Sequence, residues 1–191
     1  MSRAYRIRVK ESLKRDLKAE DSIRTQIEML EILPAEQMGE MLARELEARG
    51  FERQEDGTLV RKSENGVCVT VEPCSGEVTI RAEAEDSVEL EGHREGYGYD
   101  DVGPGNKHIK ERLSNELKAD LEKRADQHAE KVQTAATNKL EKELQDLQPE
   151  ITEVANRVTA EALKQKAAQM GEIKEISEDR ESGSLTIKVE V

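Results

Sequence analysis

The segment 91–107 holds the few residues of this chain whose types could do chemistry. Two of the four aromatic side chains in the 191 residues, Tyr97 and Tyr99, lie in it, and the adjacent carboxylates Asp100 and Asp101 follow them. Exposed aromatic side chains are frequent anchors of protein interfaces. We therefore expect Tyr97, Tyr99, Asp100 and Asp101 to bind a protein partner, unless the two tyrosines fold back and cover a sheet.

The same segment offers weaker signals for a cofactor. The turn GPGNK at 103–107 carries a lysine at the start of a helical pattern, but it lacks the glycine-lysine step and the hydroxyl of a phosphate-binding loop. Glu95, Asp100 and Asp101 are acidic enough for calcium, but the loop pattern of a calcium site is absent. We predict a helix-start turn and a solvated acidic linker. The alternative is a nucleotide- or metal-dependent enzyme, or a ligand-binding regulatory protein, with its site in this segment.

The histidines, carboxylates and cysteines of the chain give no sign of catalysis. His93, His108 and His128 have no partner at a metal-ligand spacing, and the carboxylates are too numerous for a catalytic pair to be singled out. Cys68 and Cys74 lie on neighbouring segments of a predicted hairpin, where a disulfide is geometrically possible, but cytosolic thiols stay reduced. We predict a protein that is not an enzyme and has no catalytic residue, no cofactor and no metal site.

The composition disfavours several classes of protein. Charged residues make up 38% of the chain, hydrophobic residues 35% and aromatic residues 2%, and the net charge is -12. A negative net charge disfavours general binding to nucleic acid, which depends on Lys and Arg. No run of about 18 apolar residues is present and the start has no apolar signal core, so we expect no membrane span and a cytoplasmic protein. The periodic placement of the apolar residues argues against disorder.

A small antiparallel sheet with a covering helix is predicted for residues 1–90. Apolar residues alternate with polar ones at 5–9 and 23–29, which is typical of half-buried strands, and the charged segment 13–20 between them fits either the far end of a long hairpin or a short helix. Pro34 and Gly50 bound a helix over 34–49, because proline suits the first helical position and glycine the C-terminal cap. Further strands are expected at 59–62, 67–71, 78–80 and 88–90.

From 106 to 170 the chain has the pattern of a long helix. Fourteen apolar residues from Ile109 to Val158 form one stripe with a mean step of about 3.8 residues, larger than the 3.5 of a left-handed coiled coil. One straight helix of this length would exceed the diameter of a compact globule of 191 residues. We therefore expect a helical arm that turns back at 134–138, among indifferent helix formers, in preference to Pro149. The stripe would pair inside this hairpin; the alternatives are a partner helix and a homodimer through the arm.

A β-hairpin follows in the last part of the sequence. Gly171 ends the helical pattern, and apolar residues alternate from Leu185 onwards. Because an isolated hairpin is only marginally stable, we expect this one to join the N-terminal sheet. The predicted fold class is α+β: a small antiparallel sheet with a covering helix, and a long projecting α-helical hairpin, coiled-coil-like, inserted before a C-terminal β-hairpin. The predicted parts are 1–90 (sheet and helix), 91–105 (acidic glycine-rich linker), 106–170 (helical arm) and 171–191 (hairpin).

Three phrases of the sequence resemble a bacterial family of accessory domains that are encoded beside AAA ATPases in FtsH-type ternary systems, a class of predicted conflict systems. They are SRAYRIRVKESL, LEILPAEQMGEMLARELEARGFER and NRVTAEALKQKAAQMGEIKEISEDRESGSLTIKVEV. The resemblance covers most of the chain and carries no catalytic motif, so it transfers no site residue. It implies an adaptor or scaffold that works with an AAA ATPase and small accessory proteins. Since no chemical site is evident, we expect a non-enzymatic protein that contacts other proteins, and neither nucleic acid nor membrane.

Overall fold

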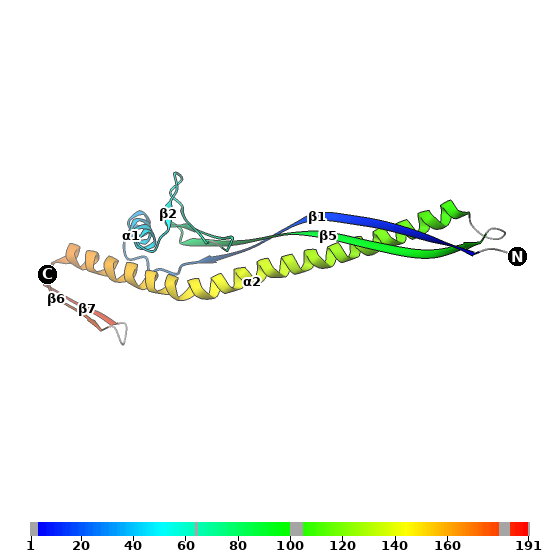
Figure 1. The fold of residues 1–191 in the computed structure, drawn as a ribbon. Helices are drawn as coiled ribbons and strands as arrows, with labels where there is room; N and C mark the ends of the chain where they lie inside the picture. Colours follow the sequence, from blue (N-terminus) through cyan, green and yellow to red (C-terminus); the bar gives the residue numbers. More distant parts are fainter. Residues whose placement is uncertain (1–3, 64, 100–104, 180–183, 191) are drawn as a thin grey trace. The chain divides into compact units, whose positions relative to one another are not determined.

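The computed structural model describes residues 4–63, 65–99, 105–179 and 184–190 of the chain (Figure 1). Five strands form one antiparallel sheet in the order β1-β5-β4-β3-β2, and two more strands form a separate sheet, β6-β7. This architecture confirms the predicted α+β fold class. The elements are β1 (Ala4–Gln26), α1 (Ala35–Glu47), β2 (Glu52–Arg53), β3 (Leu59–Lys62), β4 (Val67–Glu72), β5 (Glu77–Tyr99), α2 (Asn106–Met170), β6 (Glu172–Asp179) and β7 (Ser184–Glu190).

The chain forms two compact units. The first, here called the ribbon unit, comprises Met1–Asp21 and Glu83–Thr137, and the second, the sheet unit, comprises Ser22–Ala82 and Asn138–Val191. The strands β1 and β5 and the helix α2 each contribute residues to both units. The predicted division into four consecutive segments therefore differs from that of the structure, because three long elements each take part in two cores.

In the sheet unit, α1 and the C-terminal part of α2 pack on one face of the strands. The predicted helix is present, although Pro34 stands at its N-cap and not at its first helical position; Gly50, with a φ of +86°, follows its end as predicted. The aliphatic core lies between these helices and β3, β4 and β5. Its fully buried large side chains are Leu42, Leu46, Leu59, Val69, Val71, Val78, Ile80, Leu147, Val154 and Val158.

Arg61 of β3 ties α2 to the sheet. Its Nη1 atom donates hydrogen bonds to both carboxylate oxygens of Glu150, at 2.9 and 3.0 Å, and its guanidinium lies 4.5 Å from the centre of the Phe51 ring. The Arg61 and Glu150 side chains are only 26% and 22% exposed. Bidentate pairs and cation–π contacts that are partly shielded from water are stronger than exposed ion pairs.

In the ribbon unit, β1 and β5 run side by side along α2 (Figure 1). Odd-numbered residues of β1, among them Val9 and Leu17, and even-numbered residues of β5, among them Val88, face the helix and are buried. The segment 13–20, for which strand and helix both remained open, is part of β1. Leu13 and Leu17 keep the odd-numbered alternation of the flanking segments, which a strand places on one face.

The helix α2 is continuous from Asn106 to Met170, so the predicted turn back is wrong. The apolar stripe itself is confirmed: eleven of its fourteen residues are buried and the other three are half-buried, but they pack on strands and not on a second helical arm. The Thr134 hydroxyl donates to the carbonyl of Glu130 at 2.8 Å, which keeps this residue compatible with the helix. Burial of the stripe outweighs the weak helix propensity at 134–138 and the hydrogen bond that Pro149 removes.

The strands β6 and β7 pair with each other and form a sheet of their own. The expectation that the C-terminal hairpin joins the N-terminal sheet is therefore wrong. The reason lies in α2: because the helix does not turn back, β6 starts at Glu172, directly beyond the last helical residue.

Candidate partner-binding surface

The predicted acidic linker is in large part a strand, since β5 continues to Tyr99. Gly92 and Gly96 lie on the face of β5 that packs on α2. A Cβ atom added to either glycine would stand 2.8 Å from a Cδ1 atom, of Leu117 and Leu113 respectively. The glycines therefore let the strand approach the helix closely, and they do not mark a loop.

Tyr97 lies on the opposite face of β5 and is 59% exposed, so it does not fold back over the sheet. The guanidinium of Arg6 on β1 donates a hydrogen bond to it. Tyr99 is the last residue of β5, and Asp100 and Asp101 lie outside the described residues. Of the four residues expected to bind a partner, the structure thus shows the surroundings of Tyr97 alone.

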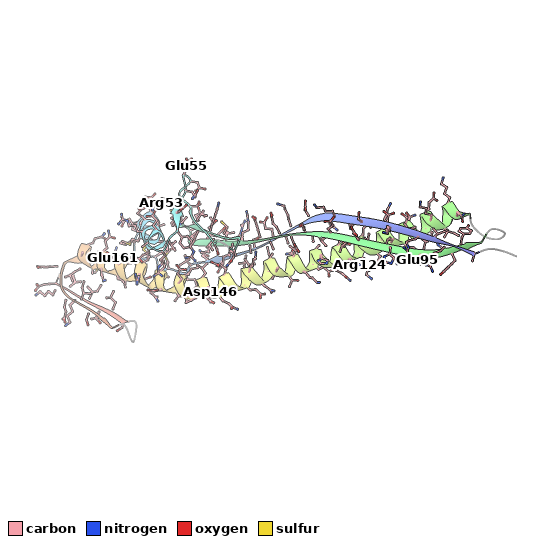
Figure 2. All side chains as sticks on the ribbon, viewed as in Figure 1. Arg53, Glu55, Glu95, Arg124, Asp146 and Glu161 are labelled. Carbon is pink, nitrogen blue, oxygen red and sulfur yellow. The ribbon has the colours of Figure 1, made fainter. Side chains whose placement is uncertain are left out.

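Two arginines of β1 meet one carboxylate of β5, two residues before this tyrosine. The Nε atom of Arg8 donates to Oε1 of Glu95 at 2.7 Å, and the Nε atom of Arg6 lies 3.5 Å from Oε2 of the same carboxylate. The side chains of Arg6 and Arg8 remain 57% and 55% exposed. We call Arg6, Arg8, Glu95 and Tyr97 the Tyr97 cluster; Figure 2 labels Glu95 on β5.

The contacts within the Tyr97 cluster favour its charged state. The hydrogen bond from Arg8, with the charges of both arginines, lowers the pKa of Glu95 below its ordinary value. The hydrogen bond to Tyr97, with the charge of Glu95, raises the pKa of Arg6. At neutral pH the cluster carries two positive charges, one negative charge and a phenol ring. This combination suits a protein partner that presents a carboxylate beside an apolar contact.

Sequence reasoning missed Arg6 and Arg8 as members of this surface. Their alternation with apolar residues assigned them to the polar face of a strand, but the partner strand was unknown, and Glu95 is 87 residues away from Arg8 in sequence. A signal was present in the charges. The outward face of β1 carries mostly bases and that of β5 mostly acids, as the further pair between Lys18 and Glu85, at 2.6 Å, illustrates.

The described residues contain no group of three or more His, Cys, Asp or Glu side chains that could hold a metal ion. His93 is exposed on the outward face of β5, and Lys107 lies in the first turn of α2. Cys68 and Cys74 are free thiols, half-exposed and exposed respectively.

The fold and this surface define a class: an α+β protein in which strands pack along one long helix and carry a charged aromatic patch outwards. A comparison with protein families matches residues 1–191 to the model of the FtsH ternary system domain X5. The chain belongs to this family, which confirms the resemblance of its sequence to the accessory domains of FtsH-type ternary systems. No curated protein and no solved structure matches the chain. In the described part of the chain, α1 and α2 both lack the length of apolar sequence needed to cross a membrane.

Proposed function

We propose that this protein is a non-enzymatic adaptor that binds another protein of its FtsH ternary system through the Tyr97 cluster. The observation that carries the proposal is the exposed Tyr97 ring beside the half-exposed Arg6 and Arg8. Tyrosine and arginine are among the residue types most enriched at the positions that dominate interface energies. Family membership supports an AAA ATPase or a small accessory protein as the partner.

The backbone under the Tyr97 cluster is held on two sides, which favours binding. It belongs to a strand paired with β1, and Gly96 next to it packs against Leu113 of α2. A surface that is already ordered loses little conformational entropy when a partner docks. The proposal therefore needs no folding step on binding.

The charges of the cluster indicate the chemistry of the partner. Arg6 and Arg8 share one carboxylate, Glu95, so two positive charges meet one negative charge within the Tyr97 cluster. The whole chain carries a net charge of -12, which repels acidic proteins at long range but is screened beyond about 10 Å in salt. We infer that the partner offers an acidic side chain to these arginines at short range, next to an apolar surface for Tyr97.

The test is co-purification of the intact protein with the products of adjacent genes. Tyr97→Ala and Arg6→Ala are each expected to weaken capture by at least about tenfold, as for central interface residues. Leu30→Ala is the matched control, since Leu30 (66%) is at least as exposed as Tyr97 (59%) but lies in the sheet unit. Failure of the unchanged protein to capture any of these products, or equal capture by Tyr97→Ala, would contradict the proposal.

The non-enzymatic part of the proposal has its own test. Nucleotides and divalent cations are expected to leave the melting temperature of the protein unchanged, because the described residues hold no group of metal-ligating side chains and the turn at 103–107 lacks the pattern of a phosphate-binding loop. A shift that is abolished by Lys107→Ala would instead support the rival, a ligand site near the start of α2. Lys110→Ala, one turn further along the same helix, is the control.

A further inference from the structure

The sheet unit contains a groove beside the last part of β1. It has a volume of about 550 Å³ and lies between residues 23–28 and the flank of α2. Its apolar lining includes Leu144, Ile151 and Ala155 of α2, which are only half-buried. Ile23, on the strand side, is 36% exposed. The helix thus extends beyond the edge of the sheet with an apolar flank that the described chain leaves partly uncovered.

The strand side of the groove is the outer edge of the sheet. β1 is the terminal strand in the order of the five-stranded sheet, so no strand of the described chain pairs with its outer edge. Natural edge strands are usually protected by charged residues or proline. Six basic residues stand between Arg6 and Lys18, whereas the stretch Ser-Ile-Arg-Thr-Gln-Ile at 22–27 holds Arg24 alone. The groove is therefore suited to one more strand, which would pair with β1 and cover the flank of α2 with its alternate side chains.

The hairpin β6-β7 has an apolar face that is not buried. Its pairing places Ile173 opposite Val189 and Ile176 opposite Ile187, with a register shift between Ile173 and Glu175. The shift matters because Ile173 and Ile176 are three residues apart and would face opposite ways on a regular strand; the extra residue puts both on one face. Leu185 extends this apolar face. None of the five side chains is buried, and Ile176 is 45% exposed. A two-stranded hairpin without a covering layer is marginally stable.

The hairpin cannot fill the groove of its own chain. The groove ends at Asn156, and helix residues 157–170 separate it from the hairpin, a distance of about 21 Å at 1.5 Å per residue. The open end of the hairpin lies at the end of α2, because Gly171 is so close to Glu190 that an added Cβ atom would overlap its carbonyl oxygen. The eight residues of β6 span about 26 Å, so a hairpin folded back along α2 would reach only the near end of the groove.

We propose that two copies of this chain exchange their C-terminal hairpins, with β7 of each copy adding to the edge of β1 in the groove of the other. The seven residues of β7 match the six groove residues at 23–28 in length. In an antiparallel pairing with Ile187 opposite Ile27, Val189 faces Thr25 and Glu190 faces Arg24. Moving β7 by two residues would set Lys188 against Arg24, a like-charge pair, so charge selects against that register. A two-fold axis makes both contacts identical.

Light scattering on the intact protein tests the exchange. The expected mass is twice the 21.5 kDa of one chain. Ile187→Glu on the hairpin and Ile151→Glu in the groove are each expected to raise the dissociation constant at least about tenfold, because each buries a charge in the contact. Thr186→Glu, on the polar face of the same strand, is the control and is expected to stay dimeric. A monomeric unchanged protein overturns the proposal, as does a dimer that Ile187→Glu dissociates but Ile151→Glu does not.

A mixture of the two variants shows whether either of them lost the dimer only because it misfolds. A chain with Ile187→Glu keeps an intact groove and a chain with Ile151→Glu keeps an intact hairpin, so the mixture is expected to form mixed dimers with one good contact. Independently, Arg24→Cys and Glu190→Cys in a chain whose Cys68 and Cys74 are changed to serine are expected to give a disulfide-linked dimer. If both variants keep the helix content of the unchanged protein but form no mixed dimer, the exchange is overturned. A disulfide that forms only within one chain, between positions 24 and 190, overturns it as well.

Discussion

The ribbon unit and the sheet unit bury the same helix with different side chains. In the sheet unit, α2 presents Leu147, Val154 and Val158 to an aliphatic core shared with α1 and three strands. In the ribbon unit, it presents Ala125 and Ala136 to two strands near their middle, and buried leucines nearer its N-terminal end. The first core is one large cluster of buried side chains, while the ribbon unit has two smaller clusters, glycines of β5 that make room for leucines of α2, and polar pairs along the seam.

Those polar pairs occur at several points of the ribbon unit. The Thr137 hydroxyl of α2 donates to Asp21 of β1 at 2.8 Å, and Arg15 of β1 pairs with Asp126 of α2 at 2.7 Å. Such contacts specify which residue of the helix meets which residue of the strand, although each exposed pair adds little stability. Small clusters of buried side chains gain less from burial than one large cluster, so we expect the sheet unit to hold most of the stability.

The largest expected effect comes from the aliphatic core. Leu42→Ala removes a fully buried side chain and is expected to lower the free energy of unfolding by about 2–5 kcal/mol. Urea denaturation measures the loss, and hydrogen exchange locates it in the sheet unit. Leu30→Ala, 66% exposed, is the control and should change stability by less than about 0.5 kcal/mol. Equal loss of protection in β1 residues of the ribbon unit would show that the two units unfold together.

The next effect separates a shielded ion pair from an exposed one. Arg61→Met leaves the Glu150 carboxylate without its bidentate partner, and we expect a loss of about 1–3 kcal/mol in urea denaturation. Arg44→Met breaks the pair with Glu40, in which the arginine is 74% exposed, and is expected to cost less than about 0.5 kcal/mol. Similar losses in both variants would refute the special role of Arg61.

The close approach in the ribbon unit can be tested by exchanging a small and a large residue across it. Gly96→Val should crowd Leu113 and lower stability by about 1–2 kcal/mol. Adding Leu113→Ala makes room, so the double variant is expected to lose about 1 kcal/mol less than the sum of the single losses. Gly105→Ala is the control, since an added Cβ there meets no atom within 4 Å. If the stability losses of the two single variants simply add in the double variant, Gly96 does not serve to make room for Leu113.

The smallest effect concerns the protonation of one carboxylate in each unit. Hydrogen bonds from Arg8 and Arg49 lower the pKa of Glu95 and of Glu153, respectively, below their ordinary value of 4.5. The folded pKa is the lower one, so each pair stabilises the fold above the unfolded value, and this contribution is lost as the pH falls through the folded pKa. In an NMR titration, Arg8→Gln is expected to raise the pKa of Glu95 and to leave that of Glu153 unchanged. An unmoved Glu95 would contradict the pairing.

The candidate site was only partly accessible to sequence reasoning. Tyr97 stood out because aromatic residues are so few, and its exposure agrees with the expected role. Arg6 and Arg8 did not stand out. The alternation of a strand shows on which face a residue lies, but it does not show which residue of a partner strand, far away in the sequence, lies beside it. Gly92 and Gly96 were taken for loop residues, since a glycine that makes room for a leucine has the same sequence signature as one in a turn.

The sequence by itself determined the elements whose causes are local: the helix between Pro34 and Gly50, the alternation of β1 and the apolar stripe of α2. Tertiary structure alone decided that the stripe packs on strands, that α2 continues through 134–138 and Pro149, and that the C-terminal hairpin forms its own sheet. The physical reason is one of magnitude. At 134–138 the propensities favour a turn by tenths of a kcal/mol per residue, and Pro149 costs about 3 kcal/mol, whereas each buried apolar side chain of the stripe contributes roughly 1–3 kcal/mol. Which surface receives that stripe depends on strands far away in the sequence.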